Sequence, residues 1–302
     1  MTSNIDKLFN AVAEKGHVCV GLDTSIDYVP LVEIKKHSNN AEAVLAYNKS
    51  LIDVTHDICA CYKVQIAYYE EMGIEGLRAY SETLKYIKRK NSLVIADIKR
   101  GDIADTAVRY AKAHFYGDFE ADFVTLSPYM GMDSIEPWLK EAEVLGKGAF
   151  VLMRTSNAGM KDFQQRTIKE PLTTESVKRL YDIVGDKLAT LAGEYRGSCG
   201  YGLFGAVIGC NEREEAAKIR ENYPNLFFLI PGYGAQGGGA LDAAALLRNG
   251  NGGVVNASRS IITAWKKTAV PDGGAEQACL EFAAAAAREA AVKTRDEILE
   301  VL

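Results

Sequence analysis

The chain has 302 residues, of which 48% are hydrophobic and 25% are charged, and its formal net charge is −5. These are ordinary values for a folded globular protein, and they exclude a disordered chain. The slightly acidic balance offers no broad attraction to nucleic acid, so an anionic ligand must be held by local groups.

No apolar run approaches the roughly 18 residues of a membrane span, and residues 1–7 lack the apolar core of a signal peptide. We therefore expect a cytoplasmic protein that does not contact a membrane. The cysteines and histidines show no zinc-like spacing, so no metal site is predicted. In a reducing compartment we expect the cysteines to be mostly small core residues without disulfides. The six cysteines are Cys19, Cys59, Cys61, Cys199, Cys210 and Cys279, and the four histidines are His17, His37, His56 and His114.

Short apolar runs, typical of buried strands, alternate along the chain with longer segments of helical periodicity. The predicted strands are 17–22, 62–67, 93–98, 122–127, 148–153, 203–209, 226–230 and 253–257. The clearest predicted helices are Ala41–Ala60, Ile74–Lys90, Ile103–Tyr116, Ser134–Leu145 and Thr174–Tyr195. Continuous apolar strands joined by helices indicate a parallel sheet that is covered on its outer face.

Eight strand–helix units predict an α/β fold of the (β/α)8 TIM-barrel type, with residues 1–302 forming one domain. A doubly wound open sheet is the alternative, but it would gather its functional groups at one switch point. Two additions to the barrel are expected: an N-terminal extension at about 1–16 and a long polar loop at about 157–172. That loop either covers the active site or is a surface insertion.

The third predicted strand ends in an unusual cluster of charge. Asp97 and Lys99 alternate along it, so both side chains point to the same face, and Gly101 allows a turn that brings Asp102 close to them. Lys63 lies in the second strand, and Asp23 ends the first. Buried charges need partners, so the pattern indicates either a structural ion pair or a reacting centre.

Two later segments favour a phosphate ligand. Residues 232–239 contain five glycines around Gln236, and Arg259 follows the last strand. In barrels the loops after strands seven and eight commonly bind phosphate, and a guanidinium makes bidentate contacts to phosphate oxygens. Taken alone, the glycine segment would be read as a flexible turn, and Arg259 could be an ordinary surface residue.

The D-x-K-x-x-D element at 97–102 and the P-G-x-G-A-Q-G-G element at 231–238 resemble the orotidine 5′-phosphate decarboxylase family, and the resemblance runs from about Val18 to Ser260. One departure is Ser258, where many members have glycine. The resemblance implies decarboxylation of orotidine 5′-monophosphate to uridine 5′-monophosphate, without a cofactor, in a homodimer that shares its active sites.

The resemblance also assigns roles to individual residues. It implies a reacting centre of Lys63, Asp97, Lys99 and Asp102, in which Lys99 stabilises and protonates the C6 carbanion. Gln236 and Arg259 would contact the 5′-phosphate, Ser156 the pyrimidine edge and Asp23 a ribose hydroxyl, while Asp102 and Thr106 would reach into the second subunit's site. Leu152 could form an apolar wall for CO2, or belong to the core.

Two other functions fit parts of this pattern. Related sugar-phosphate decarboxylases and hexulose-phosphate aldolases share D-x-K-x-x-D but use magnesium, which the positive charge of Lys63 opposes. A catalytically silent nucleotide-phosphate binder would need the phosphate elements without the buried charges, which are costly to retain.

Overall fold

The computed structural model describes residues 2–169, 177–234, 237–268 and 278–302. Eight parallel strands close into a barrel in the order β1-β10-β9-β8-β5-β4-β3-β2. Closure is made by β1 and β10, where Val18 pairs with Val255. The predicted TIM barrel is therefore confirmed, and the open-sheet alternative is wrong.

The barrel strands agree with the predicted ones to within a few residues. They are β1 (Val18–Gly21), β2 (Cys61–Gln65), β3 (Leu93–Arg100), β4 (Phe123–Leu126), β5 (Gly148–Arg154), β8 (Phe204–Ile208), β9 (Phe228–Ile230) and β10 (Gly253–Ala257). Nearly all of their residues are buried, because one face packs inside the barrel and the other lies under the helices. This explains why the strands appear in the sequence as continuous apolar runs.

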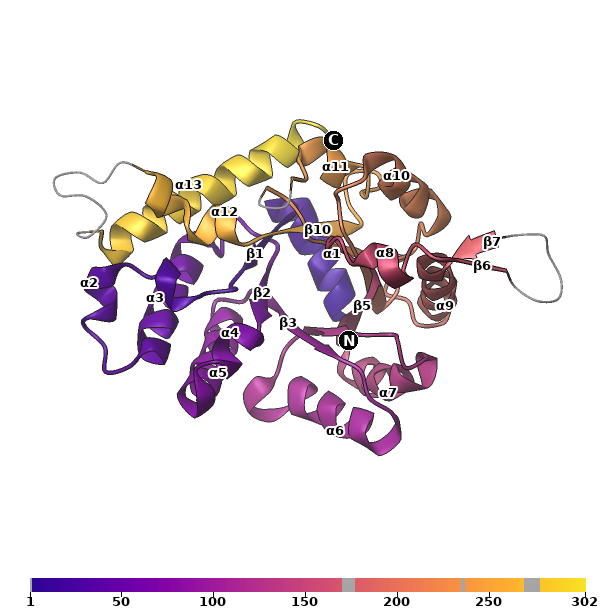
Figure 1. Cartoon of the computed structure of the whole chain (residues 1–302), viewed down its shortest axis with the longest axis horizontal. Helices are drawn as coiled ribbons and strands as arrows, with labels where there is room; N and C mark the ends of the chain where they lie inside the picture. Colours follow the sequence, from indigo (N-terminus) through magenta and orange to yellow (C-terminus); the bar gives the residue numbers. More distant parts are fainter. Residues whose placement is uncertain (1, 170–176, 235–236, 269–277) are drawn as a thin grey trace.

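Helices surround the strands (Figure 1). The longer ones are α3 (Asn40–Thr55), α5 (Gly73–Arg89), α6 (Ala104–Phe115), α7 (Glu136–Leu145), α9 (Leu180–Glu194), α10 (Arg213–Asn222) and α13 (Leu280–Leu299). The shorter ones are α2 (Leu31–Ile34), α4 (Ala67–Glu70), α8 (Met160–Phe163), α11 (Ala240–Ala244) and α12 (Arg259–Ile262). Within the described ranges no helix is both long and apolar enough to cross a membrane.

The expected N-terminal extension folds into helix α1 (Asn4–Lys15), which begins at a capping box of Ser3 and Asp6. Figure 1 shows α1 in the middle of the ring of helices. Its contacts are with residues that precede strands: Asn4 donates to Asp122, just before β4, and Asn251, just before β10, donates to the Phe9 carbonyl. Helix α1 therefore covers the amino ends of the strands and leaves the carboxyl ends for the site.

Two predicted segments differ from the structure. The segment expected as a loop at 157–172 is not irregular throughout, because it contains α8 and strand β6 (Thr167–Lys169). The helix expected from Thr174 begins only at Leu180, because β7 (Val177–Arg179) pairs antiparallel with β6. The sequence did not indicate this hairpin, because the polar composition of the segment obscures the alternation typical of a strand. Residues 170–176 lie outside the described ranges.

Candidate active site

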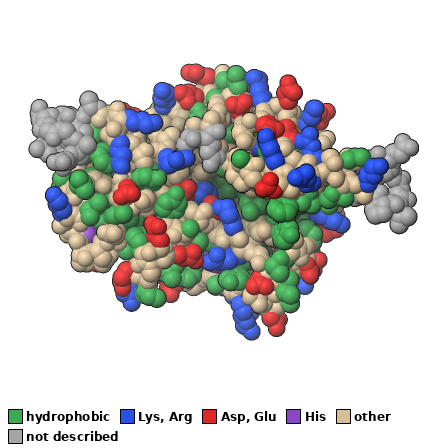
Figure 2. Space-filling view, in the orientation of Figure 1, with side chains coloured by type: hydrophobic (Ala, Val, Ile, Leu, Met, Phe, Trp, Pro, Cys, Tyr) green, Lys and Arg blue, Asp and Glu red, His purple; other side chains and the backbone are tan. Residues whose placement is uncertain are grey.

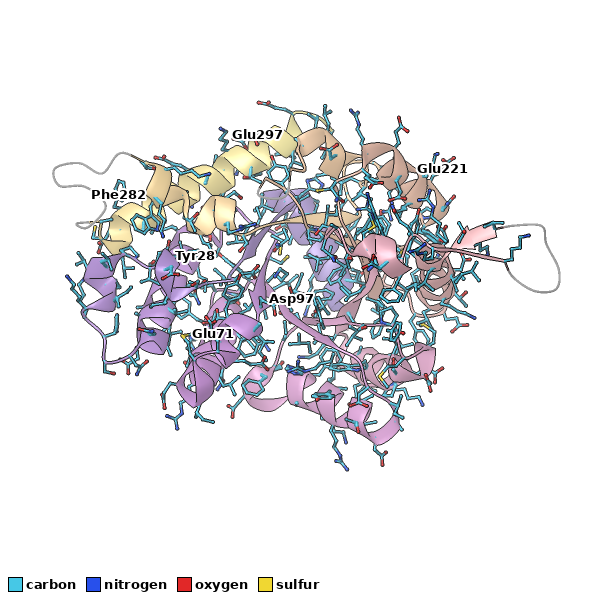
Figure 3. The ribbon with its side chains drawn as sticks, in the orientation of Figure 1. Tyr28, Glu71, Asp97, Glu221, Phe282 and Glu297 are labelled. Atoms are coloured by element: carbon cyan, nitrogen blue, oxygen red, sulfur yellow. The ribbon has the colours of Figure 1, made fainter. Side chains whose placement is uncertain are left out.

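A cavity of about 550 Å³ opens at the carboxyl ends of the barrel strands. The space-filling view shows a hollow near the centre of this face with Lys and Arg side chains beside it (Figure 2), and Asp97 lies near the middle of the ring of helices (Figure 3). Residues in or just after all eight barrel strands line the cavity. They include Asp23, Lys63, Gln65, Asp97, Lys99, Thr125, Leu152, Ser156, Val207, Pro231, Gly232, Asn256 and Arg259. The volume is in the range of small-molecule sites.

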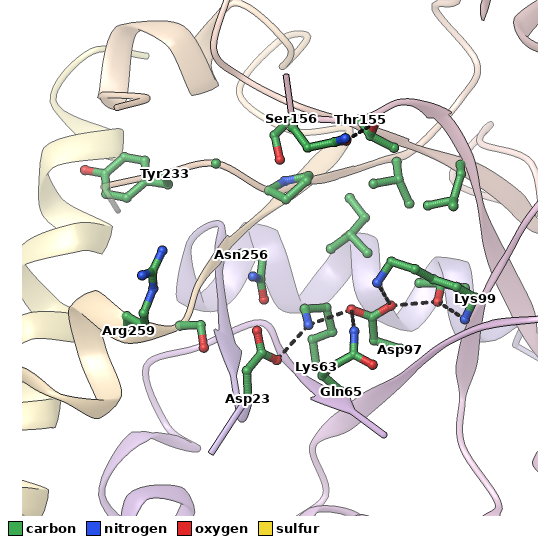
Figure 4. A pocket seen from close by; sticks show the side chains of 18 of the residues that line it. Asp23, Lys63, Gln65, Asp97, Lys99, Thr155, Ser156, Tyr233, Asn256 and Arg259 are labelled. Atoms are coloured by element: carbon green, nitrogen blue, oxygen red, sulfur yellow. Dashed lines mark hydrogen bonds and ion pairs between the residues drawn. The ribbon is translucent and has the colours of Figure 1, made fainter. Parts of the chain in front are cut away.

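Four of the predicted charged residues form one connected chain (Figure 4). The Lys63 ammonium lies 2.9 Å from an Asp23 oxygen and 2.8 Å from Asp97 Oδ2, and the Lys99 ammonium lies 2.7 Å from Asp97 Oδ1. Lys63 and Asp97 are almost fully buried, whereas 46% of the Lys99 side chain is exposed toward the cavity. Of the two lysines in this series of ion pairs, Lys99 is therefore the one that a ligand can reach.

The two buried members of this chain are both held in their charged forms. Burial alone would raise the pKa of the Asp97 carboxyl, but the charges of Lys63 and Lys99 outweigh it and hold that pKa well below its usual range. Burial would lower the pKa of Lys63, yet attraction to Asp23 and Asp97 raises it. Charge is thus fixed in the cavity before any ligand binds.

The backbone at Lys99 adopts an unusual conformation that Thr125 supports. Lys99 has a φ of 44°, in the left-handed region, and the register of β3 against β4 shifts between Ala96 and Arg100. Thr125 Oγ1 donates to Asp97 at 2.8 Å and accepts from the N–H groups of Ile98 and Lys99 at 3.0 Å each. Strained backbone of this kind persists only where its surroundings fix it, and it clusters at active sites.

Sequence reasoning missed Thr125 and two other polar residues of the cavity. Gln65 donates to Asp97 Oδ2 at 3.0 Å, and Asn256 lines the cavity from β10. Each was visible as a polar residue in or near the end of an apolar strand, and Gln65 follows Lys63 by two positions, which places both on one face.

Arg259, which was predicted to bind phosphate, lies at the other end of the cavity. Arg259 is exposed and lines the cavity, and its guanidinium makes no hydrogen bond or ion pair with any residue that the structure describes. The predicted partner Gln236 lies outside the described residues. Tyr233, in the same glycine-rich loop, is held by a 2.6 Å hydrogen bond to Glu297 of α13.

Between these two ends, the loop after β5 brings Thr155 and Ser156 to the rim of the cavity, and Leu152 of β5 lines it, partly exposed. Val207 and Leu229 line it too, so part of the wall is apolar. Leu152 therefore lies where the apolar wall was predicted. The site combines a series of fixed ion pairs, an apolar wall and a guanidinium that is unpaired within the described part of the chain.

Comparisons with known proteins agree with this geometry. Residues 16–270 match the family described as "Orotidine 5'-phosphate decarboxylase / HUMPS family". The chain belongs to this family. It is 53% identical over 297 residues to orotidine 5′-phosphate decarboxylase of Clostridium kluyveri, covering 98% of this chain and 97% of the relative.

Solved structures give the same result for the fold. An OMP decarboxylase of Leishmania donovani has a TM-score of 0.75 and 30% sequence identity, over 99% of this chain and 98% of the other. A structure described as a putative orotidine 5′-phosphate decarboxylase of Streptomyces avermitilis has a TM-score of 0.78 and 26% identity, over 100% and 96%. The family inferred from the sequence is confirmed.

Two residues to which the family resemblance gave roles lie away from the cavity of their own chain. We expected Asp102 to converge with Asp97 and Lys99, but its carboxylate instead accepts a 2.8 Å hydrogen bond from the Ile103 N–H, and Asp102 is not among the cavity residues. At Lys99 the backbone turns into the left-handed region, and the register then shifts so that Arg100 pairs with Leu126 of β4. The alternation that puts Asp97 and Lys99 on one face therefore does not extend to Asp102. Thr106, on α6, is exposed.

Proposed function

We propose that this protein is an orotidine 5′-phosphate decarboxylase, a carboxy-lyase that converts orotidine 5′-monophosphate to uridine 5′-monophosphate and CO2 in pyrimidine biosynthesis. The observation that carries the proposal is the spacing of charge in one cavity. The Lys63–Asp97–Lys99 ion pairs stand at one end, and the Arg259 guanidinium, which has no partner among the described residues, stands at the other. A nucleotide whose reacting ring and phosphate occupy opposite ends suits this arrangement, and the relatives named above are decarboxylases.

In the proposed reaction the bond between C6 and the carboxylate breaks, CO2 leaves, and the electron pair stays on C6. Lys99 donates a proton to C6, forming the C6–H bond of the product, and regains a proton from solvent. The ammonium also stabilises the developing negative charge, and Asp97 aims it without rearrangement, since both groups are already paired. Leu152 contributes to the apolar wall that receives CO2.

The rest of the nucleotide is assigned to residues around the cavity. Arg259, with Gln236, binds the 5′-phosphate through charge-assisted hydrogen bonds. Ser156 reads the polar edge of the pyrimidine, and Asp23 binds a ribose hydroxyl from its place beside Lys63. Binding energy from the remote phosphate can serve to close the glycine-rich loop over the site.

We further propose a cytoplasmic homodimer in which residues 1–302 form one domain and Asp102 and Thr106 complete the partner's site. Two observations support the shared site: Asp102 makes no ion pair with Lys63 or Lys99 of its own chain, and large apolar side chains are exposed nearby. Ile103, Tyr129, Met130 and Phe163 are 48%, 81%, 47% and 62% exposed. The rings of Tyr129 and Phe163 lie 6.4 Å apart, and large exposed apolar side chains that lie together are typical of an interface.

Magnesium-dependent chemistry, as in the sugar-phosphate branch of the family, is disfavoured by Lys63. Its ammonium already pairs with both Asp23 and Asp97, the carboxylates that a divalent cation would need. The test is direct: purified protein treated exhaustively with EDTA is added to orotidine 5′-monophosphate, and loss of the substrate's absorbance is followed. Turnover is expected without added metal. Activity that appears only when magnesium is restored would contradict the proposal.

A further inference from the structure

Directly behind the loop that carries Ser156 lies a buried charge that the proposed reaction does not use. Arg154 ends β5, two residues before Ser156, and is 1% exposed. Its Nε donates to Glu215 Oε2 of α10 at 2.9 Å, and its Nη1 donates to the Gly209 carbonyl at 3.3 Å and to Asn211 Oδ1. A buried guanidinium is costly unless it is paired in this way, so its place next to the cavity needs a reason.

The partners of Arg154 hold the main chain of Ser156. Asn211 Nδ2 donates to the Ser156 carbonyl at 3.2 Å, and the Gly209 N–H donates to the Arg154 carbonyl at 2.8 Å. Gly209 also packs directly on Ser156: a Cβ at this position would lie 2.8 Å from both Cα and Cβ of Ser156. The segment after β8 therefore fixes Ser156 by a hydrogen bond and by contact.

Arg154 determines which way the Asn211 side chain points. An amide has one accepting and two donating faces, and a guanidinium can only donate. Because Arg154 takes the Oδ1 face of Asn211, the Nδ2 group is turned toward Ser156. Glu215 in turn holds Arg154, and it also accepts a hydrogen bond from Tyr181 at 3.0 Å and pairs with Arg179. These groups thus form a connected set of hydrogen bonds and ion pairs behind Ser156, outside the cavity.

We propose that Arg154 and Asn211 are positioning residues that hold Ser156 where it reads the pyrimidine edge of the nucleotide. This inference rests on the proposed function, since it assumes that Ser156 faces the base. The inference predicts that removing either residue lowers the affinity for ligands that carry a base and leaves the affinity for ligands without a base unchanged.

The first experiment measures the affinity of uridine 5′-monophosphate and of ribose 5-phosphate by calorimetry for the whole protein and for Asn211→Ala. We expect about fivefold weaker binding of the nucleotide, as for one lost hydrogen bond, and unchanged binding of ribose 5-phosphate. Asn222→Ala is the matched control, because Asn222 is exposed at the end of α10 and its side chain makes no hydrogen bond in the described structure. Equal weakening of both ligands, or unchanged nucleotide affinity, would overturn the inference.

A double-mutant cycle supplies the second experiment. If Asn211 acts through Ser156, then Asn211→Ala should have almost no further effect on nucleotide affinity in a Ser156→Ala background, whereas additive losses would refute the positioning role. Arg154→Lys keeps the positive charge but loses the planar guanidinium and its several donors. It should lower the affinity for the nucleotide and not for ribose 5-phosphate, with folding checked by circular dichroism. These measurements use binding alone, so a failure of the proposed function, seen as absent turnover of orotidine 5′-monophosphate by the parent, is scored separately.

Discussion

Replacing Thr125 by valine removes one hydroxyl and leaves a side chain of nearly the same shape in a site that is 1% exposed. The hydroxyl donates to the Asp97 carboxylate and accepts from two backbone N–H groups. A hydrogen bond to a charged group contributes about 1.5–3 kcal/mol, and each buried donor left without an acceptor costs about 1–3 kcal/mol. Allowing for relaxation, we expect the free energy of unfolding to fall by about 3 kcal/mol.

The same change should reach the proposed reaction. Without the hydroxyl, the left-handed backbone at Lys99 and the Asp97 carboxylate lose their common support, so the ammonium is no longer aimed. We expect kcat/KM for orotidine 5′-monophosphate to fall about a hundredfold, equivalent to about 2.7 kcal/mol of transition-state stabilisation. Urea unfolding measures the first effect, and the absorbance assay under conditions where the variant is folded measures the second.

Thr55→Val is the matched control for this variant. Thr55 is equally buried and its hydroxyl bonds to the Leu51 carbonyl and the Tyr62 hydroxyl, both at 2.7 Å, but it lies on α3 and does not line the cavity. It should lose stability and keep kcat/KM. Turnover by Thr125→Val within about twofold of the parent would show that Thr125 does not position Lys99.

Four further outcomes are expected. Arg259→Ala should lower kcat/KM, with a loss of about 3 kcal/mol of transition-state stabilisation, and unchanged kcat/KM would exclude the phosphate role. The free energy of unfolding should change by less than about 0.5 kcal/mol, because the guanidinium has no partner in the described structure. Lys99→Ala should abolish decarboxylation and retain binding of uridine 5′-monophosphate, and activity within about tenfold of the parent would exclude it as proton donor. Lys63→Ala and Asp102→Ala homodimers should each be nearly inactive, yet refolding a mixture should restore roughly a quarter of the sites in a two-fold dimer; no recovery despite proven heterodimers would place Asp102 in its own subunit's site. Burial lowers the pKa of His114 to about 4, so the unfolded chain takes up a proton first and stability should decline as pH falls from about 6.5 toward 4; urea unfolding of His114→Phe should show a shallower decline, and an identical slope would refute the assignment.

Much of the fold was predictable from the sequence because both faces of a parallel barrel strand are buried. Such a strand therefore appears in the sequence as a nearly continuous apolar run. Runs such as Val18–Gly21 and Phe204–Ile208 are apolar along their whole length, and the number of such runs indicates the closed barrel. The hairpin of β6 and β7 was not predictable, because its exposed strands are short and mostly polar. The charged chain was partly predictable as well, since Asp97 and Lys99 alternate on one strand and Lys63 interrupts another.

The tertiary structure alone decided how those groups meet. Asp23 and Asp97 lie 40 and 34 residues from Lys63 in the sequence. Both reach the Lys63 ammonium because neighbouring strands bring their carboxyl ends together. The role of Thr125 depends on the register shift between β3 and β4, and the position of Asp102 depends on the backbone turn at Lys99. Local residue patterns specify which groups lie on a strand face, but hydrogen-bond partners across strands depend on register and backbone direction, which are set by the packing of the whole barrel.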